Sequence, residues 1–210
     1  MSKFVRREKI LSKQQIKQLL NVKKKVDPMP ASVYDKGGLV SGGGVDRNIR
    51  DTNKYPITHK DYPKICKTYE SYLEENYDHG HNITQFDYLD YGKGQFFMMH
   101  TDSQHHRQEL GDNSNVSGRI WSSSTLLEQS KDLQGGDLLI YGPKPNRNPM
   151  RVQLEVGETV WFPSHFFHEV TPVTKGKRTV LVVWAGETED EIKKRHSVAA
   201  TMARGNTTIL

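Results

Sequence analysis

The sequence predicts a mainly β protein with flanking helices, built on a β-sandwich or jelly-roll core. The chain has 210 residues, which is long enough for one well-packed domain and short for two independent cores. Its second half is a series of short β-rich runs separated by glycine, proline and asparagine, which is typical of sandwiches and jelly rolls. The apolar residues, 34% of the chain, are concentrated in a few of these runs.

Residues 1–84 are expected to form a helical support region within the same domain. Ser12 and Gln15 have the spacing of a capping box, and apolar residues then recur at helical intervals as far as about Lys25. A second helix is predicted from about Thr58 to Tyr77, with Pro63 in its first turn. Between them lies a glycine-rich stretch, Gly37–Gly44, which lacks the Gly-Lys-Ser/Thr ending of a phosphate-binding loop. It is interpreted either as a flap near the substrate entrance or as a plain connection.

Residues 85–186 are expected to form the β core. Eight short runs in this region predict strands: Gln85–Tyr91, Gln95–His100, Arg119–Leu127, Asp137–Tyr141, Gln153–Val156, Thr159–Phe162, Phe167–Val173 and Arg178–Trp184.

Residues 187–210 are expected to form a C-terminal helix and tail. From about Thr188 to Arg204, acidic residues come first and basic residues follow, and Gly205 then stops the helix.

The composition favours a soluble intracellular protein, cytoplasmic or otherwise. The only cysteine, Cys66, cannot form an internal disulfide. No apolar window approaches the roughly 20 residues of a membrane span. The formal charge is +5, but charges of both signs are interspersed, so neither nucleic-acid nor membrane binding is indicated.

His100 and Asp102 stand two positions apart at the end of a predicted strand. Because side chains on a strand alternate between its faces, both can point at one metal ion. His168 opens a later strand, and Arg178 opens the next one ten residues on. Two imidazoles and one carboxylate on one face of a metal are the ligand set of non-haem Fe(II) oxygenases, and a buried guanidinium can bind a carboxylate bidentately.

Other histidines compete for the third ligand position. His105 and His106 follow the first pair closely but lie in a polar run, and His165 precedes His168 by three residues and is interpreted as a loop residue. Arg178 could also be a surface hairpin residue, although the long apolar strand that follows it favours an inward position. Glu169 is expected to point away from the metal, whereas Trp121 is interpreted either as a core anchor or as part of the mouth of the site.

Four segments, in order, make the region from about Gln85 to Gly186 resemble the 2-oxoglutarate- and Fe(II)-dependent dioxygenases, specifically their prolyl 4-hydroxylase-like branch. They are Tyr91–Phe97 before the His-x-Asp pair, Gly135–Pro143, Phe162–Ser164 before the distal histidine, and the Gly-x-Arg that ends at Arg178.

The resemblance implies a double-stranded β-helix (jelly-roll) core packed against an N-terminal helical layer. It implies that His100, Asp102 and His168 bind iron, that Arg178 anchors 2-oxoglutarate, and that Tyr91 and Thr125 contact this co-substrate. The implied cofactors are Fe(II), 2-oxoglutarate and O2, with ascorbate as a reductant.

The expected reaction hydroxylates a substrate C–H bond, on a peptidyl side chain such as proline, while 2-oxoglutarate is converted to succinate. Hydroxylation of a free amino acid or small metabolite is the alternative within this chemistry. A non-catalytic metal-binding jelly-roll module is the alternative of another class, and it would have no use for Arg178. The oligomeric state stays open.

Overall fold

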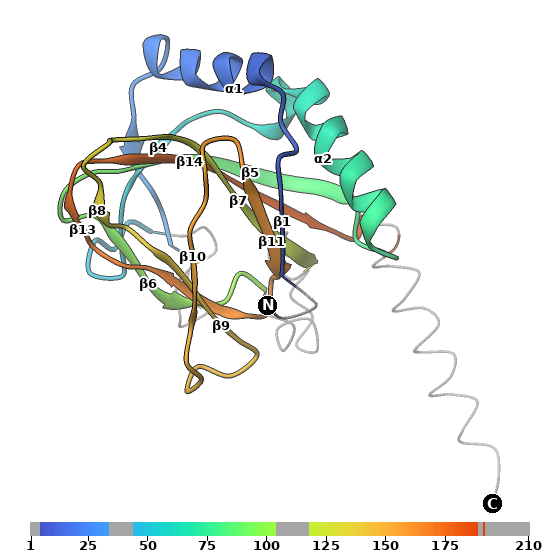
Figure 1. The fold of residues 1–210 in the computed structure, drawn as a ribbon. Coiled ribbons are helices and arrows are strands. Elements are labelled where there is room, and N and C mark those ends of the chain that lie inside the picture. The colour runs from blue at the N-terminus through green and yellow to red at the C-terminus, as the bar shows by residue number, and fades with distance from the viewer. Residues whose placement is uncertain (1–4, 34–43, 104–117, 189–190, 192–210) are drawn as a thin grey trace, which may run out of the picture.

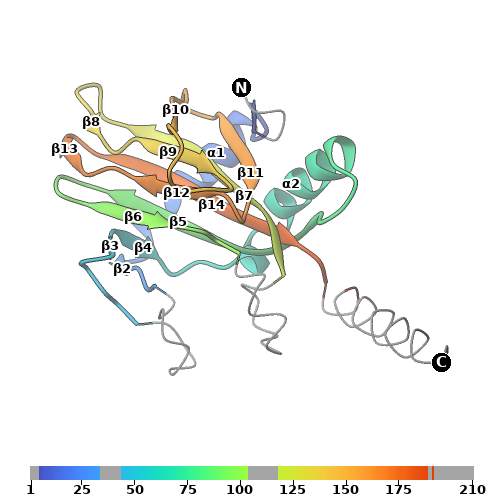
Figure 2. The ribbon, with the colours of Figure 1, turned by 90° about the horizontal axis from the view of Figure 1, so that it is seen from below.

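Two β-sheets packed face to face form the frame of the protein in the computed structural model, which describes residues 5–33, 44–103, 118–188 and 191. Helices cover the outer face of the larger sheet, and the smaller sheet lies on its other side (Figures 1 and 2). The prediction of a mainly β jelly roll with an N-terminal helical layer is therefore confirmed.

Within the described residues, the larger sheet has seven strands in the order β1-β11-β7-β14-β5-β4-β2, and all neighbouring strands are antiparallel. The strands are β1 (Arg6–Glu8), β11 (Thr159–Pro163), β7 (Arg119–Gln129), β14 (Arg178–Gly186), β5 (Asn82–Tyr91), β4 (Asn53–Tyr55) and β2 (Met29–Pro30).

The smaller sheet has five described strands in the order β10-β9-β12-β6-β3, again antiparallel. They are β10 (Met150–Val152), β9 (Leu138–Gly142), β12 (Phe167–Val170), β6 (Phe96–His100) and β3 (Arg50–Asp51). A two-stranded ribbon joins β8 (Gln134–Gly135) to β13 (Val173–Lys175).

The helical layer begins where the capping box predicts. Helix α1 (Lys13–Leu20) is capped by Ser12 and Gln15, and the 3-10 helix η1 (Asn21–Lys24) continues it. Helix α2 (Pro63–Asn76) follows the 3-10 turn η2 (His59–Asp61) and has proline at its first position. Both predicted helices are thus confirmed.

Strand β14 shows how the alternation of side chains builds two cores. Leu181, Val183 and Ala185 belong to the cluster formed with the helices, whereas Val180 and Val182 belong to a cluster between the sheets. Fully burying one such aliphatic side chain contributes about 1.5–3 kcal/mol relative to leaving it exposed. The inner face of this strand is the face that also carries Arg178.

The prediction of a strand at Gln153–Val156 is wrong, because β10 pairs with β9 only over Met150–Val152. The backbone N–H of Glu155 donates to the side chain of Glu158 (2.7 Å), and Gly157 has a φ of 90°. A turn therefore forms where the apolar pattern indicated a strand. The run Phe167–Val173 is also divided, since β12 ends at Val170 and the ribbon begins at Val173.

Residues 5–84 contain strands that the sequence did not predict. Strand β1 extends one edge of the larger sheet, β4 pairs with β5, and β3 extends the smaller sheet. Each has only two or three residues, too few for alternation to be visible. The N-terminal region therefore contributes to both sheets as well as supplying the helices.

Several predictions fall outside the described residues. These are most of the glycine-rich stretch (residues 37–43), His105 and His106, and the C-terminal helix beyond Glu191. Within the described residues, the helices are too short and too polar to cross a membrane.

Candidate metal and co-substrate site

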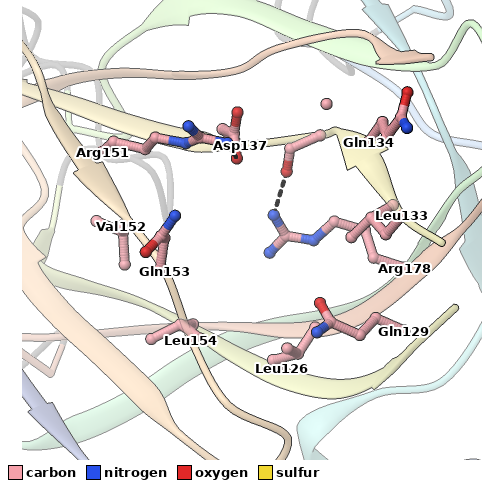
Figure 3. Close-up of a pocket in the computed structure, with 12 residues that line it drawn as sticks. Leu126, Gln129, Leu133, Gln134, Asp137, Arg151, Val152, Gln153, Leu154 and Arg178 are labelled. Carbon is pink, nitrogen blue, oxygen red and sulfur yellow. Dashed lines mark hydrogen bonds and ion pairs between the residues drawn. The ribbon is translucent and has the colours of Figure 1, made fainter. Parts of the chain in front are cut away.

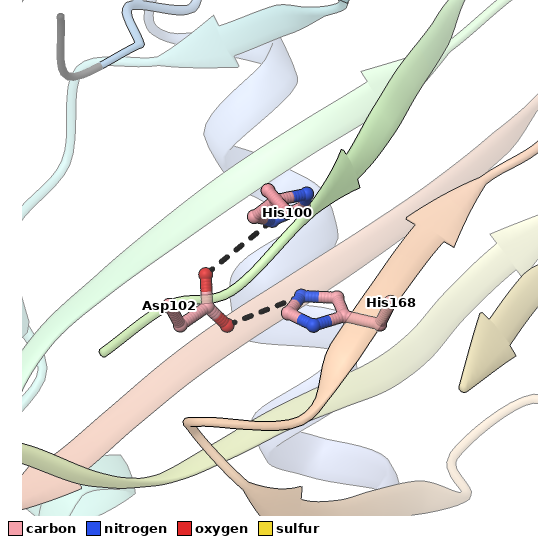
Figure 4. A group of neighbouring side chains, drawn as sticks. All are labelled: His100, Asp102 and His168. Carbon is pink, nitrogen blue, oxygen red and sulfur yellow. Dashed lines mark ion pairs between the residues drawn. The ribbon is translucent and has the colours of Figure 1, made fainter. Parts of the chain in front are cut away.

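Two histidines and one aspartate meet at one end of the smaller sheet (Figure 4). His100 ends β6, Asp102 follows two residues later, and His168 lies on β12 directly opposite His100. One ligand atom from each residue lies within 4.8 Å of the other two. The Asp102 carboxylate is 3.5 Å from Nε2 of His100 and 3.3 Å from Nε2 of His168.

The backbone orients both imidazoles in the same way. Nδ1 of His100 lies 2.8 Å from the carbonyl oxygen of Met98, and Nδ1 of His168 lies 2.9 Å from that of Phe166. When each Nδ1 carries the proton and donates it to its carbonyl, each Nε2 presents a lone pair to the centre of the group. Second hydrogen bonds of this kind fix metal-binding histidines in proteins.

The loop after β11 holds Asp102 in place. The backbone N–H groups of Asp102 and Ser103 both donate to the carbonyl of Ser164, at 2.9 and 3.1 Å. The Ser164 hydroxyl, fully buried, bonds the hydroxyl of Ser122 on β7 at 2.8 Å. The ligand loop is thereby tied to the larger sheet.

The electrostatics of the three groups are coupled. Burial alone would raise the pKa of Asp102, but the charge of His168 and, when Nε2 carries a proton, the hydrogen bonds from both histidines hold it well below its usual range. Burial lowers the pKa of His100, and the neighbouring His168 lowers it further. For His168, burial is outweighed by Asp102, which raises its pKa. A carboxylate that stays ionised next to two imidazoles suits a divalent cation such as Fe(II).

Arg178 and Tyr91 are partners across β14 and β5, and both line the cavity that contains the three ligands. Arg178 is 8% exposed, donates one hydrogen bond from Nη1 to the carbonyl of Gly136, and forms no ion pair with a carboxylate of the described residues. Burial lowers the pKa of Arg178 and raises that of Tyr91. A buried cation without an anionic partner is costly, so this position suits a bound carboxylate.

The space between the metal group and Arg178 is narrow, about 40 Å3.

The prediction that Thr125 faces the co-substrate is contradicted by the structure. Thr125 is fully buried, and its hydroxyl bonds Tyr69 of α2 at 2.5 Å and Thr159 at 2.7 Å. It therefore lies on the helix-covered face of the larger sheet. Ser124, one residue earlier, lines the cavity. The error is a shift of one position, which reverses the face of a strand.

The other side chains singled out in the sequence lie away from the three ligands. Glu169 accepts a hydrogen bond from Tyr141 at 2.6 Å, and His165 stands exposed in the loop before β12. Trp121 packs against Tyr77, with ring centroids 4.0 Å apart, so it is a core anchor.

Three residues of the site were missed by sequence reasoning. Arg50 lines the cavity with its guanidinium over the Phe97 ring, 4.7 Å from the centroid. Arg119 is buried over Trp184, at 4.0 Å, and its Nη1 donates to the backbone carbonyl of Asp102 at 3.5 Å. Trp184 itself lines the cavity. Arg50 gave no signal because it follows a glycine-rich stretch, whereas Arg119 at the start of a long predicted strand could have been suspected.

The family model described as the 2OG-Fe(II) oxygenase superfamily matches residues 86–186. This segment contains the three candidate ligands and Arg178. This part of the chain is thus similar to the 2-oxoglutarate- and Fe(II)-dependent oxygenases.

Particular relatives support this placement. A PKHD-type hydroxylase of Alteromonas mediterranea is 29% identical over 94 residues, which cover 45% of this chain and 39% of that protein. The matched part thus spans well under half of this relative.

Two solved structures share the fold at low identity. A 2OG-Fe(II) oxygenase family oxidoreductase from Burkholderia pseudomallei has a TM-score of 0.64 at 12% identity, covering 88% of this chain and 86% of that one. A prolyl hydroxylase from Trichoplax adhaerens, in complex with a hypoxia inducible factor oxygen degradation domain peptide fragment, has a TM-score of 0.64 at 16% identity, covering 92% and 87%.

Proposed function

We propose that the protein is an Fe(II)- and 2-oxoglutarate-dependent hydroxylase acting on a peptidyl side chain, with proline the favoured residue. The observation that carries the proposal is the meeting of His100, Asp102 and His168 in one cavity with a buried guanidinium that no carboxylate of the described residues neutralises. Three ligands on one side of a metal leave positions for a chelating keto acid and dioxygen.

Each side chain has a distinct part in this proposal. His100, Asp102 and His168 would hold Fe(II), and Arg178 would bind the distal carboxylate of 2-oxoglutarate with Tyr91 beside it. Bound iron, with 2-oxoglutarate and O2, would supply the oxidising chemistry, in which the co-substrate becomes succinate and carbon dioxide. The chain's own contribution is orientation and an apolar cavity wall that includes Leu89, Val180 and Val182 and limits access of water.

The peptide substrate is supported by two likenesses. The Trichoplax structure is a prolyl hydroxylase with a peptide bound, and the curated relatives are PKHD-type hydroxylases. A free amino acid or another small metabolite is the second candidate. Incubation with proline-containing peptides, followed by intact-mass analysis for the gain of one oxygen, separates the two.

The activity itself is tested by succinate formation from 2-oxoglutarate under air with added Fe(II). We expect Asp102→Ala to abolish turnover, because a three-ligand site loses its only carboxylate. We also expect ascorbate to increase the number of turnovers by returning oxidised iron to Fe(II). Full succinate formation by the Asp102→Ala protein would overturn the proposal.

A non-catalytic metal-binding module would use the three ligands and not Arg178. Metal binding that Arg178→Met leaves intact, in a protein that forms no succinate, would favour that module. Succinate formation that depends on Arg178 favours the hydroxylase.

A further inference from the structure

The ring of Phe97 stacks on the imidazole of His100, one of the three candidate ligands. The two ring centroids lie 3.6 Å apart and the ring planes are inclined by 21°, so the imidazole covers one face of Phe97. The two residues are three positions apart, which on a regular strand would place them on opposite faces. A bulge in β6, where His168 pairs with His100 and Val170 pairs with Phe97, brings both side chains into the metal cavity.

The guanidinium of Arg50 covers the other face of Phe97. Its Cζ lies 4.7 Å from the ring centroid, and the first face is already occupied by the imidazole. A planar guanidinium is suited to stacking on an aromatic ring, whereas the ammonium group of lysine is not planar. The pairing of Arg50 with Phe97 between β3 and β6 carries the arginine to this position. Arg50, Phe97 and His100 therefore form a three-layer stack beside the metal group.

An ion pair between the two sheets holds Arg50. Its Nη2 is 3.4 Å from Oδ2 of Asp87 on β5, and its Nη1 donates to the carbonyl of Ser32 at 2.9 Å. Asp87 is fixed in turn by Lys54 at 2.5 Å and by the side-chain amide of Gln85 at 3.3 Å. Because Arg50 and Asp87 are both buried, salt screens their attraction little. The guanidinium is thereby held in one orientation.

Arg50 differs in this respect from Arg178, the other arginine that lines the metal cavity. Arg178 also borders a second hollow of about 410 Å3, and Figure 3 shows its guanidinium facing that open space while it donates to the carbonyl of Gly136. The guanidinium of Arg50 is enclosed by the carbonyl of Ser32, the carboxylate of the ion pair and the ring of the stack. Its contacts are thus with the protein itself, which suits the positioning of a neighbour and not the binding of an anion.

His100 depends on such support more than His168 does. Each histidine places Nδ1 against one backbone carbonyl, a single contact about which the ring can still tilt. The side chain of His168 is 7% exposed and that of His100 is 19% exposed, so less of the His100 ring is packed against other groups. The face of Phe97 supplies the missing constraint.

We propose that Asp87 and Arg50 are positioning residues of the metal site, which hold Phe97 flat against His100 and so fix the direction of the Nε2 lone pair. This inference rests on the proposed role of His100 as a metal ligand. Removal of an outer contact that orients a ligand imidazole typically weakens metal binding by roughly 10–100-fold. Loss of the stack should therefore weaken metal binding although all three ligands remain.

Calorimetric titration of the metal-free protein with Co(II), an air-stable substitute for Fe(II), measures this effect. Arg50→Lys keeps the positive charge opposite Asp87 but cannot stack, and Asp87→Asn removes the charge that holds the guanidinium. We expect each variant to weaken Co(II) binding at least about tenfold, and either suffices if the other does not fold. Lys54→Met is the matched control, because it removes the second cation that pairs with Asp87 and lies outside the stack. It should bind Co(II) as the wild type does.

Proton NMR of the metal-free protein tests the stack itself. The ring current of Phe97 should shift the ring protons of His100 upfield, because they lie against its face. Arg50→Lys should reduce this shift, whereas Lys54→Met should leave it unchanged. His100→Asn identifies the resonances by their absence.

Wild-type Co(II) affinity in either folded stack variant, Arg50→Lys or Asp87→Asn, would overturn the inference. Equal weakening by Lys54→Met would also overturn it, because the loss would then come from general destabilisation, and so would an unchanged His100 resonance in Arg50→Lys. Failure of the wild type to bind Co(II) would overturn the proposed metal site and with it this inference. Binding by the wild type leaves the proposed function standing whichever way the variants behave.

Discussion

Replacing Thr125 with valine separates a structural role from a role in co-substrate binding. The Thr125 hydroxyl bonds the hydroxyls of Tyr69 and Thr159, and all three side chains are fully buried. Valine has nearly the same shape but cannot form these bonds. Leaving a buried polar group without a partner costs about 1–3 kcal/mol. Tyr69 also interacts with Thr159, so these two groups keep each other as partners.

The expected loss of unfolding free energy for Thr125→Val is therefore about 1–2 kcal/mol. For a protein of this size, that loss lowers the Tm by roughly 2–8 °C. Urea unfolding followed by circular dichroism measures the change, and the slope with denaturant should stay that of the wild type. The KM for 2-oxoglutarate should not change, because Thr125 faces the helices.

Ser124→Val is the paired variant, since it places the same side chain one position earlier on the strand. Ser124 lines the narrow cavity, where the two methyl groups of valine in place of one hydroxyl would obstruct the co-substrate. We expect the KM for 2-oxoglutarate to rise at least about tenfold. A Thr125→Val protein with wild-type stability and a raised KM would refute the assignment of faces on β7.

Three further perturbations test other parts of the structure. Arg178→Met should raise the KM for 2-oxoglutarate by at least about 30-fold, equivalent to about 2 kcal/mol for a lost buried charge pair, and an unchanged KM would show that the anchor lies elsewhere. Asp87 is buried between Arg50 (3.4 Å) and Lys54 (2.5 Å); burial acts to raise its pKa, but these cations outweigh it and lower the pKa below 3.8. Ionised Asp87 thus stabilises the fold fully above pH 3.8, and this contribution is lost as the pH falls below that value. Asp87→Asn should therefore make the free energy of unfolding fall less steeply at acid pH than in the wild type, and an identical fall would contradict this. Gly135→Ala should cost at least about 1–2 kcal/mol, because φ is +70° and an added Cβ would lie 2.1 Å from the carbonyl oxygen of Pro172; equal urea midpoints would be inconsistent with that contact.

Local patterns in the sequence were enough for the two N-terminal helices, most core strands and two of the three candidate ligands. The capping box at Ser12 and the proline at residue 63 act within a few residues of chain, so their effect is visible without tertiary structure. The spacing of His100 and Asp102 could be interpreted in the same way, because strand geometry places residues two apart on one side. His168 required the resemblance, since no local rule connects residues 68 positions apart.

Tertiary structure decided the features that depend on long-range contacts. Strands as short as β3 exist only because a neighbouring strand supplies their hydrogen bonds, and thus Arg50 reaches the cavity. The face of Thr125 depends on the register of β7 against β11 and β14, where a shift of one residue exchanges the two sides. By itself the sequence determined which residue types are available and roughly where the chain turns. The packing of the sheets decided which of these residues share a cavity, and it placed Arg178 in the walls of two cavities. Only the tertiary structure could show this, because the whole fold sets the distances between remote segments.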